Sequence, residues 1–173
     1  ENLSEIECEF FQSRAMYAPV GIGKGVYIQD SWTGENRRIL FVCPRIGMSP
    51  YFENIYKNFV KDFGDMPYSI AGSQPITICY DKNVLGYLSK EKYELLYDTH
   101  KVMYYHSMEP RHIHYHPLEA IVCGLPLIFM GGGQLDLLGG NNLPGRCSNI
   151  KEARKKIKHI LNGDKKLIND IRT

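Results

Sequence analysis

Imidazole groups are concentrated in one short stretch of this 173-residue chain. Four histidines fall between positions 106 and 116: His106, His112, His114 and His116. Pro117 and Glu119 follow at once, ahead of a short apolar run. Imidazoles donate and accept hydrogen bonds near neutral pH, and a carboxylate accepts them from hydroxyl groups. The stretch therefore carries side chains suited to a ligand with phosphate and hydroxyl groups.

We expect a helix over residues 117–123 that ends at Gly124. Proline suits the first helical position, because the amide hydrogen that it lacks would have no partner there. This predicts His116 as the N-cap and Glu119 as the third helical residue. A helix N-terminus offers free N–H groups and partial positive charge to a phosphate, and a nearby carboxylate can bind a sugar diol. The alternative is that Glu119 only interacts with the helix dipole and His116 only caps the helix.

His112, His114 and His116 alternate, so in an extended loop all three would lie on one side and could imitate a metal site. No carboxylate or cysteine completes a convincing set of ligands, and we predict no metal ion and no other cofactor. We expect the histidines to donate hydrogen bonds to phosphate or sugar instead. A protonated histidine could also compensate phosphate charge near neutral pH.

The elements that must position these residues alternate between strands and helices. The apolar run Ile39–Cys43 stops at Pro44 and is typical of a buried parallel strand. Apolar residues then recur every three or four positions up to Phe63, which predicts an amphipathic helix ended by Gly64. Further strands are expected at residues 68–72, 76–80, 83–86, 102–105 and 125–130, and further helices at 89–97, 150–162 and 165–171.

This alternation implies right-handed crossovers and a parallel sheet covered on both faces. We predict an α/β domain, a Rossmann-like doubly wound sheet, over residues 37–173. Residues 1–36 are interrupted by proline and glycine and are predicted to be a linker that leads into it. Gly21–Gly25 superficially suggests a phosphate loop but lacks the G-x-x-x-x-G-K-[ST] spacing. Ligands of such sheets bind beyond the carboxyl ends of the strands, where the loop after Tyr105 is the richest in polar groups.

Composition narrows the class of partner. A formal charge of +2 is too near balance to require nucleic acid, and we expect none. Five widely spread cysteines with no ligand spacing, and no apolar run of the roughly 20 residues that span a bilayer, favour a reducing, cytoplasmic setting. The predicted helix 150–162 has a basic face, which is either solvated or in contact with an anionic membrane.

Two stretches resemble a known family. HYHPLEAIVCGLPLIF, residues 114–129, closely resembles the PLEA-x-x-x-G-x-P-hydrophobic signature of retaining glycosyltransferases of the two-Rossmann-domain (GT-B) type. NVLGYLSKEKYELLYDTHKVMYYHSMEP, residues 83–110, looks like the strand, G-x-L-S, helix and strand that precede this signature in the glycosyltransferase family 4 group. With its context the resemblance covers roughly residues 37 to 170, one half of a GT-B fold.

The resemblance implies roles for residues of this sequence. Glu119 would bind the ribose hydroxyls of a donor nucleotide, and backbone groups near His116, Pro117 and Leu118 would face its phosphates. Gly86 and Tyr87 would lie near the base.

The match departs from the family at the residues that contact sugar and diphosphate. Glu109 lies ten positions before Glu119, where the family commonly has eight, which puts its contact with the donor sugar in doubt. Arg45 keeps the role of the diphosphate arginine, but Pro50 stands where the family has a lysine. Lys57 could replace that lysine, although a solvated side chain is the expected reading.

The implied activity is transfer of a sugar from a nucleoside diphosphate donor to a hydroxyl of a glycan, polysaccharide or lipid-linked acceptor, held by an N-terminal domain missing from this chain. The alternative is a noncatalytic nucleotide- or sugar-binding module of a larger assembly. A third reading is a sugar-nucleotide epimerase of similar two-domain architecture, which would need an acid and a base from both halves.

Overall fold

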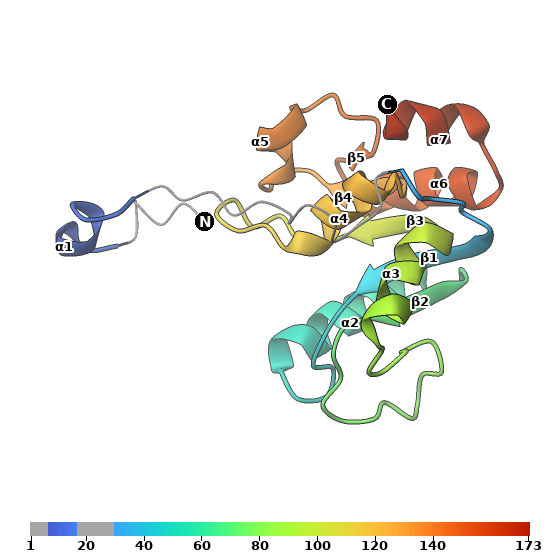
Figure 1. Ribbon diagram of the computed structural model, residues 1–173, viewed down its shortest axis with the longest axis horizontal. Helices are drawn as coiled ribbons and strands as arrows, with labels where there is room; N and C mark the ends of the chain where they lie inside the picture. Colours follow the sequence, from blue (N-terminus) through green and yellow to red (C-terminus); the bar gives the residue numbers. More distant parts are fainter. Residues whose placement is uncertain (1–6, 17–29) are drawn as a thin grey trace.

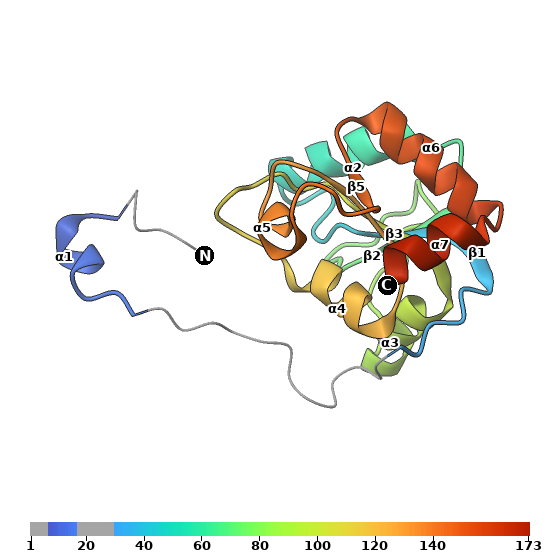
Figure 2. The same ribbon diagram turned by 90° about the horizontal axis from the view of Figure 1, so that it is seen from above.

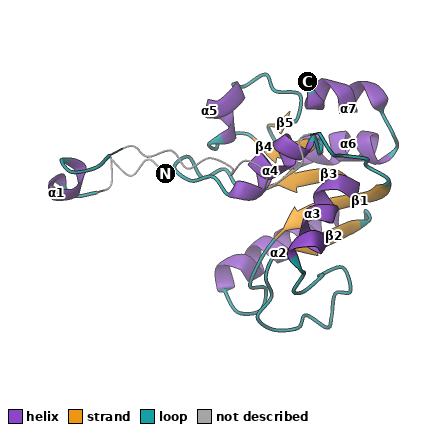
Figure 3. Ribbon diagram, in the orientation of Figure 1, coloured by secondary structure: helices purple, strands orange, loops and turns teal. Residues whose placement is uncertain are grey.

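The computed structural model describes residues 7–16 and 30–173 of the chain. Its strands are β1 (Asn36–Val42), β2 (Tyr68–Ala71), β3 (His100–Tyr105), β4 (Leu127–Met130) and β5 (Arg146–Cys147). Its helices are α1 (Glu9–Gln12), α2 (Pro50–Phe63), α3 (Lys90–Thr99), α4 (Tyr115–Cys123), α5 (Leu135–Gly139), α6 (Ile150–Leu161) and α7 (Lys165–Arg172) (Figures 1 and 3).

All strand pairs are parallel, and the strand order is β2-β1-β3-β4-β5. Helices α2 and α6 lie on one side of the sheet, and α3 and α4 lie on the other (Figure 2). The chain moves outward from β1 to β2, then returns to the other side of β1 to form β3 and continues in the opposite direction. The predicted α/β, Rossmann-like doubly wound fold is confirmed.

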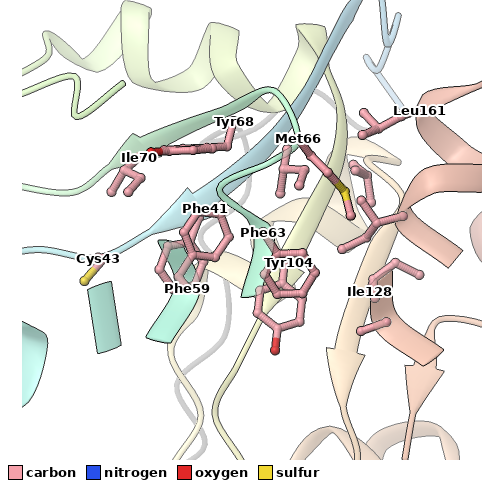
Figure 4. Packing of buried hydrophobic residues seen from close by; sticks show 14 of the residues in the cluster. Phe41, Cys43, Phe59, Phe63, Met66, Tyr68, Ile70, Tyr104, Ile128 and Leu161 are labelled. Carbon is pink, nitrogen blue, oxygen red and sulfur yellow. The ribbon is translucent and has the colours of Figure 1, made fainter. Parts of the chain in front are cut away.

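Each face of the sheet has its own apolar core, which explains the continuous apolar runs of the strands. On the α2/α6 face, Phe41 stacks on Phe59 with ring centroids 4.0 Å apart, and Phe63 packs on Tyr104 at 4.5 Å (Figure 4). On the α3/α4 face, the core includes Leu40, because successive side chains of a strand point to opposite faces and Leu40 precedes Phe41. The carboxyl ends of the strands are therefore supported by packed helices on both faces of the sheet.

One predicted strand is wrong and another is reduced to a single bridge. Residues 76–80 form no strand, because the chain must return from the carboxyl end of β2 to its amino end before it can lie parallel to it again. Residues 83–85 then run along the outer edge of β2: Ile70 donates its amide to the carbonyl of Asn83 and accepts the amide of Leu85.

A buried carboxylate fixes the segment that leads to Gly86 and Tyr87. Asp81 accepts hydrogen bonds from the hydroxyls of Tyr68 (2.8 Å) and Tyr56 (3.1 Å) and from the amide of Asn83 (2.9 Å). Burial acts to raise the pKa of Asp81, but these hydrogen bonds outweigh it and the pKa is lowered. The segment is therefore held by an ionised group under the β2 edge.

Helix α6 turns its apolar stripe into the core. Its inward side chains Ala153, Ile157 and Ile160 are fully buried, so they are not available for insertion into a membrane. Asn149 caps the helix, accepting the amide of Glu152 at 2.9 Å. In the described ranges no helix is both long and apolar enough to cross a membrane.

Part of the predicted linker is ordered on the domain. The Trp32 indole donates to the carbonyl of His100 at 2.7 Å, and the Arg172 guanidinium lies 4.6 Å from the Trp32 ring centre. Gly21–Gly25 lies outside the described residues. All five cysteines fall inside the described ranges and are free thiols; the cytoplasmic location stays a prediction.

Candidate functional site

The order in which strands are added to the sheet reverses between β1 and β3. A ligand crevice is expected at this point. The loop after β1 leads toward α2 on one face, and the loop after β3 leads to α4 on the other face. Loops that diverge from neighbouring parallel strands leave a space beyond the carboxyl ends of those strands. Residues 43–49 and 106–114 form these two loops. They bring Arg45 and the four histidines to the same edge of the sheet.

The histidine cluster, defined as His106, His112, His114 and His116, is packed around the ring of Tyr105. The rings of His112 and His114 lie 4.6 Å apart, and those of His114 and His116 lie 5.3 Å apart. The Tyr105 hydroxyl lies 3.2 Å from Nδ1 of His114, and its ring centre lies 5.2 Å from that of His116. The cluster is thus a compact aromatic and polar wall at the end of β3.

Burial keeps most of the histidine cluster uncharged. It lowers the pKa of His116 to about 3 and of His106 to about 4, and it also lowers the pKa of His114, with neighbouring imidazoles adding to the shift. These three imidazoles are therefore uncharged near neutral pH in the ligand-free protein, and compensation of phosphate charge by a protonated histidine stays a prediction. They can still donate and accept hydrogen bonds, and Nδ1 of His106 is buried with no partner among residues 7–16 and 30–173.

Helix α4 begins two residues earlier than its sequence predicted. The N-cap is His114, whose amide is 3.4 Å from the Tyr105 hydroxyl, so Pro117 is the third helical residue. Proline is accepted there because amides of the first turn have no acceptor within the helix. The open amides at the helix mouth belong to Tyr115 and His116. Leu118 falls at the fourth position, where the amide bonds back to the N-cap carbonyl.

Glu119 lies one turn inside α4 and faces α3. Its side chain is half-buried, and Oε2 accepts a hydrogen bond from the hydroxyl of Tyr97 at 2.8 Å. The Tyr97 hydroxyl is also 3.0 Å from that of Tyr93. Neither tyrosine was singled out from the sequence as part of the site. Their only signal there is a spacing of four residues, which puts both on one face of a helix.

The other predicted residues occupy different surroundings. Arg45 is exposed and has a left-handed φ of 55°, but its amide donates to Ser73 and its carbonyl accepts from Met48, so its backbone is fixed. Tyr87 is 84% exposed and follows Gly86 (φ 69°) at the outer side of β2.

Glu109 is exposed, and its Oε1 accepts the amide of Arg111 at 3.1 Å within a turn. Lys57 is exposed on α2 and pairs with Glu53 at 3.2 Å, the solvated arrangement that its sequence favoured.

No family model matches the chain, and no curated protein sequence matches it either.

A glycine-rich loop after β4 closes the site on the side away from β1. The Gln134 amide group donates to the carbonyl of Pro110, which joins this loop to the one that carries the histidines. Gly133 approaches so closely that a Cβ atom there would lie 3.1 Å from Cα of Met108. Arg146 holds Asp136 through two hydrogen bonds of 2.8 and 3.0 Å, and Asp136 accepts the amide of Gly132 at 2.7 Å.

Within the described part of the chain, no group of three or more His, Cys, Asp or Glu side chains is arranged to hold a metal ion. The site offers four kinds of group instead: an exposed guanidinium, open helix amides, neutral imidazoles and one oriented carboxylate. Together they suit a ligand that combines negative charge with neighbouring hydroxyl groups.

Proposed function

We propose that this domain binds the nucleoside diphosphate sugar of a glycosyltransferase reaction. The observation that carries the proposal is the position of Glu119, the glutamate of the PLEA motif. It lies half-buried one turn inside α4, beside the point where the sheet reverses, with one carboxylate oxygen fixed by Tyr97. A carboxylate placed there can accept hydrogen bonds from the two ribose hydroxyls of a nucleotide whose phosphates meet the helix N-terminus.

The leaving diphosphate would be stabilised by fixed donors. The amides of Tyr115 and His116 open at the mouth of α4, and Arg45 extends from the opposite loop. Such donors lower the barrier when they face the oxygen atoms on which charge develops as the bond to the sugar breaks. His116 would act as a neutral hydrogen-bond donor, because its pKa lies far below neutral pH.

A second domain would hold the acceptor, which is a hydroxyl of a glycan, a polysaccharide or a lipid-linked sugar. Large apolar side chains are exposed in the segments that follow the carboxyl ends of the strands: Met48, Tyr51, Met108, Tyr115 and Leu137. Exposed apolar groups near a candidate site support a partner surface there. Contact with an anionic membrane through the basic face of α6 stays part of the proposal, carried by exposed lysines such as Lys151 and Lys155.

The second candidate is a noncatalytic nucleotide- or sugar-binding module. Three observations favour it: Pro50 begins α2 where the family has its diphosphate lysine, Lys57 is engaged with Glu53, and Glu109 is engaged in a turn. A donor domain would support hydrolysis of the donor sugar when joined to its second domain, whereas a binding module would not.

Calorimetric titration of the 173-residue chain with UDP, GDP, ADP and dTDP tests the proposal directly. We expect one of the four diphosphates to bind with a Kd in the micromolar range and the others at least about 10-fold more weakly. UDP, GDP and ADP differ only in the base, so a difference among them identifies the base that the site prefers. Folding is verified by circular dichroism before each titration. Folded protein that binds none of the four diphosphates contradicts the proposal for this chain.

Replacing Arg45 by alanine is expected to weaken diphosphate binding by about 10-fold, the lower end of what a charge-assisted hydrogen bond contributes. The loss should be smaller for the corresponding monophosphate and should shrink as salt is raised, because exposed charges are screened. Lys57→Ala is the matched control, since it removes one exposed positive charge that pairs with Glu53. Equal losses in the two variants would assign the effect to overall charge and not to Arg45.

A further inference from the structure

A chain of hydroxyl groups leads from α3 to the carboxylate of Glu119. Tyr93 and Tyr97 are one helical turn apart, with their ring centres 5.4 Å apart and their hydroxyl oxygens 3.0 Å apart. Tyr97 is fully buried, and its hydroxyl lies 2.8 Å from Oε2 of Glu119. The three side chains join two helices that pack against each other on one face of the sheet.

The directions of these hydrogen bonds follow from the chemistry of the groups. An ionised carboxylate can only accept, so the Tyr97 hydroxyl donates to Glu119. The Tyr97 oxygen can then accept from the hydroxyl of Tyr93, which makes Tyr93 the first donor of the chain. Burial raises the pKa of both tyrosines, so that both hydroxyls keep their protons at neutral pH.

The Tyr97 hydroxyl fixes one oxygen of the Glu119 carboxylate. Oε1 of Glu119 accepts no hydrogen bond within residues 7–16 and 30–173, while Oε2 is bound to Tyr97. A free glutamate side chain loses rotamer freedom when a ligand orders it, and that loss weakens binding. A glutamate that is already held by a buried hydroxyl avoids most of this loss.

We propose that Tyr97, supported by Tyr93, is a positioning residue that orients Glu119 toward the ribose hydroxyls of a bound nucleotide. This inference rests on the proposed function of the domain. It adds a second pair of residues, from α3, to a site whose sequence motif lies wholly in α4. Their role is confined to the sugar part of the nucleotide, since neither tyrosine is among the groups at the helix mouth.

The test compares ribonucleotides with their 2′-deoxy counterparts in Tyr97→Phe, which keeps the buried ring and removes only the hydroxyl. The probes are UDP, GDP and ADP, each paired with the 2′-deoxy form. We expect Tyr97→Phe to weaken the preferred ribonucleotide by about 5- to 10-fold and the deoxy form by less than about 2-fold. The ratio of the ribonucleotide affinity to the deoxynucleotide affinity measures the contribution of the ribose hydroxyl. Tyr93→Phe should lower this ratio by only about 2-fold, because Tyr97 keeps its bond to Glu119.

Other results would overturn either the positioning role of Tyr97 or the proposed function of the domain. An unchanged ratio in Tyr97→Phe, or an equal loss for both forms of the nucleotide, overturns the positioning role and leaves Tyr97 as a packing residue. If Tyr97→Phe fails to fold, an unchanged ratio in Tyr93→Phe overturns it instead. If wild-type protein binds no diphosphate, or Glu119→Gln binds as tightly as wild type, the proposed function itself fails, and the positioning role fails with it.

Discussion

Glu119→Gln is expected to weaken binding of the preferred nucleoside diphosphate by about 10- to 100-fold, the range for losing hydrogen bonds to a charged group. The substitution is nearly isosteric. Its amide oxygen can still accept from Tyr97, so the buried hydroxyl keeps a partner and the helix contact is retained. Its NH₂ group, however, cannot accept from a ribose hydroxyl. Isothermal titration of both proteins measures the difference.

The control for this substitution is Glu94→Gln. Glu94 lies on α3 and pairs with Lys90 at 3.7 Å, so its loss changes the net charge equally and leaves the Tyr97–Glu119 hydrogen bond in place. Both variants should melt within a few degrees of wild type, because each retains its packing. If Glu119→Gln binds the diphosphate as tightly as Glu94→Gln does, Glu119 does not contact the nucleotide and only interacts with the helix dipole.

Local patterns were sufficient to predict four of the five strands and the helices α2, α3, α4 and α6 that cover them. The three- and four-residue spacing before Phe63 predicted α2, with its end to the residue, because one face of a helix is buried. The apolar run Ile39–Cys43 located β1 but missed its first three residues, 36–38, which are polar. The short elements α5 and β5 were missed. Five and two residues carry too few positions to show a period, and β5 exists only because β4 offers it an edge.

Candidate site residues could be singled out from the sequence where their own type marks them, and were missed where only a contact between elements does. Glu119 and the histidines stand out in the sequence, and they do gather at the end of β3 and the start of α4. The bond from Tyr97 to Glu119 spans 22 positions and depends on how α3 packs on α4. The start of α4 was misplaced because the Tyr105 hydroxyl bonds the amide of His114, a contact that proline preference cannot report.

The same burial that keeps the histidines neutral should make the fold sensitive to acid, and His100 gives the clearest case. It is 2% exposed at the start of β3, its Nδ1 lies 3.0 Å from the carbonyl of Leu96, and its Nε2 is buried without a partner in the described part of the chain. Burial lowers its pKa to about 4, with a smaller contribution from the nearby positive charge of Arg38, while the hydrogen bond to Leu96 acts in the other direction.

The sign follows from proton uptake. Between pH 6.5 and about 4 the unfolded chain binds a proton at this position and the folded protein does not, so the free energy of unfolding falls as pH falls through that window. Protonation of His100 lowers the free energy of unfolding by on the order of 3 kcal/mol in total. The whole decrease is present below about pH 4, and none of it is present above about pH 7. Carboxylates add to the acid sensitivity of any variant, so the comparison must be between matched proteins.

We expect His100→Phe to remove this part of the pH dependence. The ring volume is nearly kept, the amide of residue 100 can still donate to Leu96, and no group remains there to be protonated. Urea unfolding from pH 7.5 to 4.5 should give wild type a steeper decline in stability than the variant, with the two curves diverging below pH 6.5. His159→Gln is the matched control: it removes an exposed imidazole and leaves the buried His100 in place, so it should retain most of the wild-type decline. Parallel curves for wild type and His100→Phe would mean that His100 takes up its proton in the folded protein as readily as in the unfolded chain, and that the start of β3 is open to water.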